Sequence, residues 1–292
     1  MMSQEVKYPK ATLEEYGYKD YRVLTMIWKI AKIILVIFSI FMLYLSVIVI
    51  AIQSFNSSAS TTEFQSFTFD NYLQMFSKRS LTNSIKNTFL VSITATLIAA
   101  VLGTFVAIGI FYLPPKIKSR LMLLNNIPLL NADIVTGISL MLIFSLLLPI
   151  NRHIFGFWTI LIAHLFFIFP YIILSVLPKM KEIDPNLMDA SMDLGIKPMK
   201  SVIRVLIPAI RGGIFSGVVL AFTISFEDFV VGYFTTGNGF NTLSIWIYSS
   251  IGKKSLFPGV YAFSTALTLI SMVLIIIYAI WTKGRRSHAK KN

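Results

Sequence analysis

The chain has 292 residues, of which 55% are hydrophobic and 13% charged, and its mean hydropathy is +0.74. This composition excludes an ordinary water-soluble globular fold and indicates an integral membrane protein. The absence of cysteine excludes disulfides and thiolate metal sites. The net charge of +13 is not accompanied by a nucleic-acid-binding motif, so we expect no nucleic acid partner.

Six apolar runs are long enough to cross about 30 Å of hydrocarbon as helices of roughly 20 residues. They cover residues 33–52, 85–113, 121–148, 157–178, 212–234 and 259–281. The predicted fold class is therefore all-α, a polytopic membrane protein of six helices. We expect an N-terminal segment (1–32), a six-span domain (33–282) with a cytoplasmic loop at 179–211, and a basic tail (283–292). The N-terminal segment is too long and too acidic for a cleaved signal peptide, so the first span is expected to remain as an anchor.

The distribution of Lys and Arg predicts the orientation of these spans. With six spans, 20 of the 26 basic residues fall on the side that holds the N-terminal segment, the loop 179–211 and the tail. The positive-inside rule then places both termini and this loop in the cytoplasm. The expected location is the bacterial cell membrane, with several passes.

The first external loop and the second span carry different signals. The loop is rich in Ser and Thr, and Asp70-Asn71-Tyr72 predicts a short interfacial helix with an Asx cap. That helix could meet an external partner or have none, and both possibilities remain open.

In the second span small residues recur every four positions, which predicts close helix packing: Ala95, Ala99, Gly103 and Ala107.

The third span contains Asp133. Counted along a straight helix from Leu121, Asp133 lies roughly 18 Å into the membrane, where an ionisable residue marks a pathway or a buried partner. Pro128 loosens the helix, so a broken segment with Asn131 and Asp133 lining a cavity is expected. As an alternative, Asp133 caps the restarted helix through its own backbone N–H groups.

The fourth span contains His164 near its middle. A lone His on an apolar helix is most simply explained by a hydrogen bond to a neighbouring helix. No metal site is expected, because the other two histidines, His153 and His288, fall on opposite sides of the membrane.

A polar and amphipathic stretch from Asp184 to Pro208 separates the fourth and fifth spans. Asp184 and Pro185 are a helix-start pair, because the Asp side chain can accept an orphan N–H and Pro loses no needed donor. Gly195 is predicted to end this helix with positive φ, and a second helix is predicted from Pro198. The apolar stripe of the second helix is Val202, Val205 and Leu206. We expect two helices joined at a glycine turn outside the bilayer.

The fifth span contains Glu227 and Asp228. Glu227 lies roughly 22 Å from the cytoplasmic end, at a depth comparable with Asp133 if the third span is kinked. Apart from Lys86 at the edge of the second span, no Lys or Arg lies inside a span, so the three carboxylates form an unpaired acidic zone that suits a cationic solute. Adjacent helical residues point about 100° apart, so one of the pair is expected to serve packing, and which one stays open. A hydrogen-bonded helix break or a subunit contact is the alternative for the pair.

The stretch from Asp184 to Pro208 resembles the EAA loop of permease subunits of ABC importers. In that motif Glu-Ala-Ala is followed after three residues by Gly, and after nine more by Ile, one residue and Leu-Pro. Here the triplet is Asp189-Ala190-Ser191, followed at the same spacing by Gly195, Val205 and Ile207-Pro208. The resemblance implies that the helix before Gly195 docks into a groove on a cytoplasmic ATPase. The alternative is an amphipathic loop that rests on the membrane surface.

The stretch from Ser225 to Ile251, SFEDFVVGYFTTGNGFNTLSIWIYSSI, resembles PotC-like permease subunits of spermidine/putrescine ABC importers. Asp133–Val135 and the order of the spans are also similar, and the resemblance covers residues 33–284. It implies a type I ABC importer permease fold, surrounded by membrane lipid. The implied partners are a PotB-like second permease, a PotA-like ATPase dimer and a PotD-like receptor that delivers the polyamine. The implied contacts with the ATPase are Asp189, Ala190, Ser191, Gly195 and Pro208, and the residues implied to border the polyamine route are Asp133, Glu227 and Asp228.

No catalytic constellation is present: the sequence has no phosphate-binding G-x-x-x-x-G-K-[ST] loop and no HExxH motif. We therefore expect no enzymatic activity and no cofactor in this chain, with ATP and Mg bound by the partner ATPase. Two alternatives remain open. The same architecture could carry iron, thiamine or phosphonates, because related acidic stretches occur in those permeases. A stand-alone cation channel or secondary carrier is the other, and it predicts transport without ATP.

Overall fold

The structure is a computed structural model that describes residues 18–58, 63–151, 154–184, 186–237, 239–251 and 257–289. Within these ranges the chain is helical, without strands and with one isolated β-bridge between Asn56 and Phe67. The expected all-α class is confirmed. Several features used above lie outside the described residues: segment 1–17, His153, Pro185 and residues 290–292.

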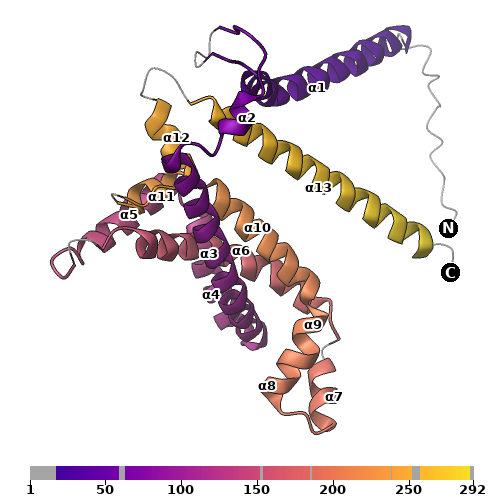
Figure 1. The fold of residues 1–292 in the computed structure, drawn as a ribbon. Helices are drawn as coiled ribbons and strands as arrows, with labels where there is room; N and C mark the ends of the chain where they lie inside the picture. The colour runs from indigo at the N-terminus through magenta and orange to yellow at the C-terminus, as the bar shows by residue number, and fades with distance from the viewer. Residues whose placement is uncertain are drawn as a thin grey trace, which may run out of the picture. The chain divides into compact units, whose positions relative to one another are not determined.

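The helices fall into two compact units. The first contains α1 (Tyr18–Ser54), α2 (Asp70–Gln74) and α13 (Gly259–Ala289), and α13 contacts both α1 and α2 (Figure 1). Nearly every described side chain of α1 is exposed, although the helix is long and apolar enough to cross a membrane. Its surroundings must therefore be apolar, as lipid or another chain would provide.

The loop after α1 confirms the expected short helix but not its cap. The N–H of Asp70 donates to the hydroxyl of Thr68 at 3.1 Å, and no side-chain cap bond is formed by the residue that precedes α2. The Asn71 amide instead donates to the carbonyls of Ser54 and Asn56 at 2.9 and 2.8 Å. The Asx cap expected here is therefore wrong, because Asn71 ties α2 back to the end of α1.

Asn56 is fully buried and organises the same loop. Its Nδ2 donates to the side chain of Gln53 and to the carbonyl of Glu63, both at 2.8 Å. Its Oδ1 accepts the N–H groups of Ser58 and Gln65, both at 3.1 Å. One side chain thus satisfies backbone groups on both sides of the loop.

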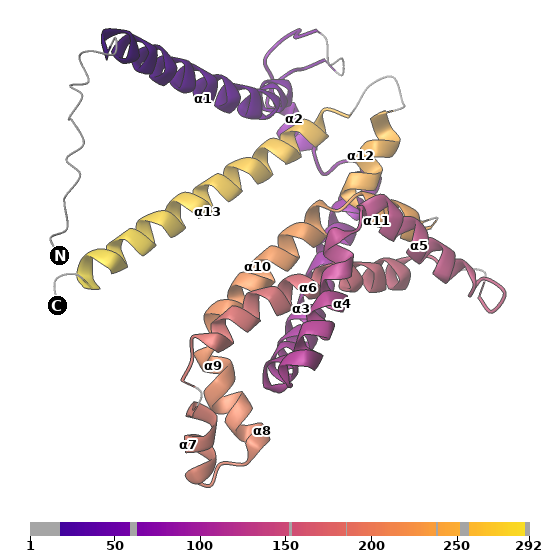
Figure 2. The same cartoon turned by 180° about the vertical axis from the view of Figure 1, so that it is seen from behind.

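The second unit contains three long helices and several shorter ones. The long helices are α3 (Arg79–Tyr112), α6 (Phe157–Lys181) and α10 (Arg211–Glu227). The shorter elements are α4 (Pro115–Leu130), α5 (Asp133–Ser145), α7 (Leu187–Asp193), α8 (Pro198–Ser201), the π-helical turn η1 (Val202–Leu206), α9 (Ile207–Ala209), α11 (Val230–Thr235) and α12 (Leu243–Ile251). Within this unit α3, α6 and α10 pack side by side, α7 to α9 lie at one end, and α5, α11 and α12 lie toward the other (Figures 1 and 2).

The predicted small-residue stripe of α3 is the face that packs in this unit. All four positions, Ala95, Ala99, Gly103 and Ala107, are buried. A Cβ added at Gly103 would lie 2.8 Å from Cγ2 of Ile172 in α6, too close for any larger side chain without movement. The stripe therefore sets the short distance between α3 and α6, which confirms the packing role expected from the sequence.

By length and composition, three described helices can cross a membrane: α1, α3 and α6. Two bent pairs of helices pass the same test together, which gives up to five spans in the described residues. One pair is α4 with α5, and the other is Pro198–Ala209 with α10, bent by 73°. A chain that crosses the membrane several times is thus supported, while the count of six and the boundaries of the segments stay predictions.

Candidate functional site

A cavity of about 370 Å³ lies where two helix breaks of the second unit come together. One break separates α4 from α5, and the other separates α10 from α11. The cavity is lined by the carboxylates of Asp133, Glu227 and Asp228 and by two aromatic residues of α6, Phe167 and Tyr171. None of the described residues that line it is Lys or Arg. Such a lining suits a cationic ligand.

The first of these breaks lies within the third expected span. α4 ends at Leu130, α5 begins at Asp133, and their axes are bent by 102°. Pro128 cannot donate a backbone hydrogen bond, and Asn131 and Ala132 are extended, with ψ of 142° and 136°. The expected loosening after Pro128, with Asn131 and Asp133 at a cavity, is confirmed. The depth of 18 Å along a straight helix does not hold, because the axis turns.

Asp133 begins α5 without capping it. The N–H groups of Val135 and Thr136 donate to the carbonyl of Ala132 at 2.9 and 3.1 Å, and α5 has no side-chain cap bond. The alternative in which Asp133 serves as the cap is therefore wrong. Its carboxylate is exposed in the first turn, where the positive end of the helix dipole favours a negative charge.

The fifth expected span stops at Glu227 and restarts at Val230, with Asp228 extended between them (φ −60°, ψ 133°). The Asp228 carboxylate accepts the N–H of Gly232 at 2.7 Å and that of Val231 at 3.3 Å, so it satisfies two donors in the first turn of α11. The alternative of a hydrogen-bonded helix break is thus confirmed. Adjacent residues point about 100° apart only within a continuous helix, so this restriction does not apply across the break. Both carboxylates line the cavity, and 8% of the Asp228 side chain is exposed.

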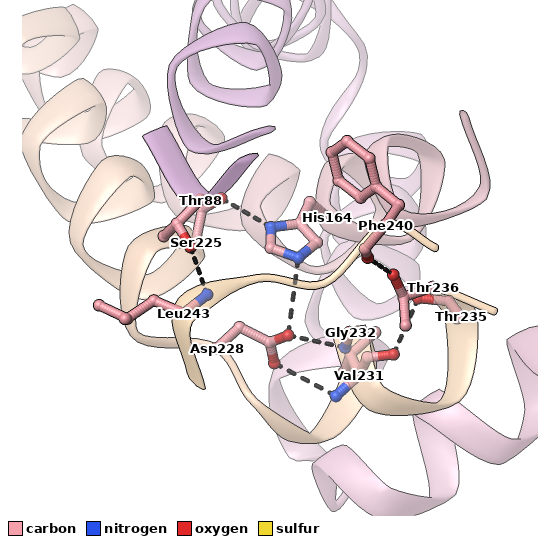
Figure 3. A network of polar contacts seen from close by, with 10 residues as sticks. All are labelled: Thr88, His164, Ser225, Asp228, Val231, Gly232, Thr235, Thr236, Phe240 and Leu243. Carbon is pink, nitrogen blue, oxygen red and sulfur yellow. Dashed lines mark hydrogen bonds and ion pairs between the residues drawn. The ribbon is translucent and has the colours of Figure 1, made fainter. Parts of the chain in front are cut away.

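His164 of α6 joins this break to α10 (Figure 3). Its Nδ1 lies 2.7 Å from the hydroxyl of Ser225, which confirms the hydrogen bond expected to a neighbouring helix. Its Nε2 lies 3.6 Å from Oδ2 of Asp228 and has no hydrogen-bond partner within the described residues. The ring is 2% exposed. His164 therefore contacts Asp228 in the protein interior, where solvent does not reach the ring.

Sequence reasoning missed the contact between His164 and Asp228 and the two aromatic residues of the cavity. The sequence did contain a signal for this contact. A buried carboxylate needs a polar partner, and His164 was the available candidate because the spans that contain these acids have no Lys or Arg. No pattern singled out Phe167 or Tyr171, which are two aromatic residues on a helix rich in them. In the part of the chain that the structure describes, no group of three or more His, Asp or Glu is placed to hold a metal ion.

The loop between α6 and α10 has the predicted glycine turn. α7 ends in a Schellman motif: Gly195 N–H donates to the carbonyl of Met192 at 2.8 Å, and Ile196 N–H donates to that of Ser191 at 3.3 Å. Gly195 has a φ of +81°, as predicted. Upstream, Asp184 Oδ1 accepts the backbone N–H of Asn186 at 2.9 Å, but α7 begins only at Leu187, so the helix start predicted at Asp184 and Pro185 is wrong by two residues.

α7 has a packed face and an exposed face. Met188 packs against the hydrophobic core, while Ser191 is 6% exposed and hydrogen-bonds the hydroxyl of Ser201 in α8. The opposite face is open to solvent at Asp189, Ala190, Met192, Leu194 and Gly195. Leu194 is 83% exposed and, together with Ala190 and Met192, leaves an apolar surface for a partner.

Pro208 follows the π-helical turn η1, in which the N–H of Ile207 donates to the carbonyl of Val202 five residues back. A proline clashes with the carbonyl four residues before it, and the wider turn accommodates the ring. Leu206 is 3% exposed and Val202 also packs against the core, so these two members of the predicted stripe face inward. The two segments of the loop are thus held on one side by core contacts.

Comparison with known proteins identifies relatives over most of the chain. Residues 99–287 match the family described as "Binding-protein-dependent transport system inner membrane component". The chain is 29% identical over 230 residues to the spermidine/putrescine transport system permease protein PotC of Escherichia coli (strain K12), covering 79% of this chain and 85% of that protein. It is 28% identical over 251 residues to the putrescine transport system permease protein PotI of the same strain, covering 84% and 87%.

The fold is similar to a chain in the crystal structure of a bacterial ABC transporter involved in the import of the acidic polysaccharide alginate. The TM-score is 0.64 at 15% identity, over 92% of this chain and 99% of that one. A likeness at this identity concerns the fold alone, and it confirms the expected importer permease fold. Since the family match covers more than half of the chain, this protein belongs to the binding-protein-dependent transport system inner membrane components and is a permease subunit.

Proposed function

We propose that the chain is a permease subunit of an ATP-driven importer that carries polyamines such as spermidine and putrescine across the bacterial cell membrane. The observation that carries this proposal is the cavity with three carboxylates and, in its described lining, no Lys or Arg. A polyamine is a flexible chain with several ammonium groups, so it matches carboxylates spaced around one cavity and aromatic faces beside them. The names of the relatives PotC and PotI point to the same cargo.

The pathway would form between this chain and a PotB-like second permease, with a PotD-like receptor outside and a PotA-like ATPase dimer in the cytoplasm. The excess of basic residues supports this orientation, with both termini and the loop 179–211 on the ATPase side. In this arrangement Asp133, Glu227 and Asp228 border the route of the cargo.

The exposed face of α7 would couple this chain to the ATPase. Ala190, Met192 and Leu194 provide small and flexible apolar side chains that can fill a groove on the partner. The hydrogen bond between Ser191 and Ser201 ties α7 to α8, so a push on α7 reaches α8, η1 and α9 and then α10. ATP-driven closure of the ATPase dimer would open the cavity outward, and hydrolysis would reverse the change.

The test is uptake of labelled spermidine and putrescine into proteoliposomes that hold the chain with its second permease, ATPase and receptor, with and without ATP. Asp133→Asn and Glu227→Gln should each raise KM about tenfold or more, because each removes one charged contact with the cargo. Glu182→Gln is the matched control. That carboxylate is exposed and forms a surface ion pair with Lys179, so uptake should be unchanged.

The outcomes separate the alternatives. ATP hydrolysis without polyamine uptake would support the importer architecture and refute the polyamine cargo. Uptake of labelled thiamine, iron or a phosphonate would then identify the cargo. Uptake without ATP would support the channel or secondary carrier instead.

A further inference from the structure

The three carboxylates of the cavity are not equivalent. Asp133 and Glu227 are exposed, and the structure gives neither a hydrogen bond nor an ion pair with another described residue. Asp228 has 8% of its side chain exposed and uses both oxygens to bind backbone N–H groups of α11. A ligand in the cavity can therefore reach the first two far more easily than the third.

Glycine at position 232 allows this arrangement. A Cβ added there would lie 3.0 Å from Oδ2 of Asp228 and 3.4 Å from a methyl of Ile160 in α6. The carboxylate can approach the Gly232 N–H to 2.7 Å because no side chain stands in its way. The contact is thus built into the local geometry of the break.

α6 holds α11 at both ends. At the C-terminal end, the hydroxyl of Thr159 donates to the carbonyl of Thr235 at 2.7 Å. At the N-terminal end, the Nε2 atom of His164 lies 3.6 Å from Asp228, which in turn binds the first turn of α11 (Figure 3). α11 therefore has a polar contact with α6 at each of its ends, while α5 packs along it.

The contact with Ser225 fits either tautomer of His164, because the hydroxyl can donate or accept. Where the Ser225 hydroxyl donates to Nδ1, the ring proton of a neutral imidazole is on Nε2 and points at the carboxylate of Asp228. This polar hydrogen is the closest side-chain group that can offset the burial of Asp228 in a region without Lys or Arg. The ring is 2% exposed and is not among the residues that line the cavity.

We propose that His164 is a positioning residue: it holds Asp228 as the anchor of α11, so that Asp133 and Glu227 are the carboxylates that receive the cargo. The second half rests on the proposed transport of a cation, whereas the first half concerns this chain alone. Phe229, Val230 and Val231 line the cavity, so releasing Asp228 would change the cavity wall without removing a cargo contact.

The test uses the absence of cysteine in the sequence. Val231 is 2% exposed in the first turn of α11, so Val231→Cys should react slowly with a small cationic methanethiosulfonate in the assembled complex. His164→Leu should raise this rate roughly tenfold, because the buried carboxylate loses its polar contact with Nε2 at 3.6 Å. Ala95→Cys, at a fully buried position of α3, is the control that should stay protected in the same variant.

Two conservative variants separate the contacts of the ring. His164→Gln places an amide near the position of Nε2 and should keep the Val231→Cys rate low. His164→Asn reaches only the position of Nδ1 and should behave like His164→Leu. Asp228→Ala should raise the rate at least as much as His164→Leu, because it also removes the two bonds to α11. The double variant should raise the rate no further than Asp228→Ala, because His164 acts through Asp228.

The kinetics of transport provide a second measurement. In complexes that take up spermidine, His164→Asn should lower the maximal rate with little change in KM, while Asp133→Asn should raise KM. Protection of Val231→Cys in His164→Leu and His164→Asn, or additive effects in the double variant, would overturn the role of His164. Because the labelling needs no cargo, a wrong polyamine assignment would leave that result readable.

Discussion

Gly195 ends α7 with a φ of +81°, a conformation that costs a residue with a Cβ about 1–2 kcal/mol. No atom lies within 4 Å of a Cβ added at this position, so Gly195→Ala introduces the backbone cost without a clash. An energy of this size lowers the population of the intact turn roughly 5- to 30-fold. We expect ATP-driven uptake to fall with it, because the turn connects the exposed face of α7 to α8.

The series Asn, Ala and Val at position 195 tests the backbone explanation. Asn tolerates positive φ and should keep most of the uptake, Ala should lose more, and the β-branched Val should lose most. Gly109→Ala is the matched control: a Cβ there also has no atom within 4 Å, but Gly109 lies within α3 with ordinary helical φ. Helical Ala is favoured over Gly by roughly 0.5–1 kcal/mol, so uptake should persist.

The assay measures ATP-dependent uptake, ATP hydrolysis stimulated by the receptor, and co-purification of the ATPase with the permease. Hydrolysis should become less dependent on the receptor as uptake falls. Equal uptake in all variants at position 195, or a loss in Asn as large as in Val, would refute the backbone explanation and with it the role of this turn in coupling.

Three further predictions follow from packing and hydrogen bonds. Gly103→Val should lower the free energy of unfolding in detergent by about 1–3 kcal/mol, since its Cβ would meet Ile172. Ile172→Ala should restore part of this loss, and the absence of any rescue would contradict the contact. Ser191→Ala and Ser201→Ala should each reduce ATPase binding, and the double variant should lose less than the sum, since both remove one bond. Asn56→Ala leaves several backbone groups unsatisfied at about 1–3 kcal/mol each, so proteolysis of the loop after α1 should accelerate; an unchanged cleavage rate would show that the loop does not need this side chain.

Local sequence determined much of this protein. The four-residue spacing of small residues from Ala95 to Ala107 identified the packed face of α3, because helix geometry alone puts such positions on one side. Gly195 was identified as the turn with positive φ, because the conformational preference of glycine is local. The EAA-like spacing indicated the family without any tertiary contact, since the motif is defined by residue order alone.

The tertiary structure decided the arrangement around the cavity. From the sequence, Glu227 and Asp228 were adjacent positions on one helix, and only one was expected to face a lumen. The helix ends between them, since Asp228 binds two N–H groups of the next helix and pairs with a histidine 64 positions earlier. Such contacts depend on how buried charges find partners in a low-dielectric interior, and neither propensity nor periodicity encodes them. The sequence placed three acids in the membrane, and the fold distinguished the buried anchor of α11 from the two exposed carboxylates.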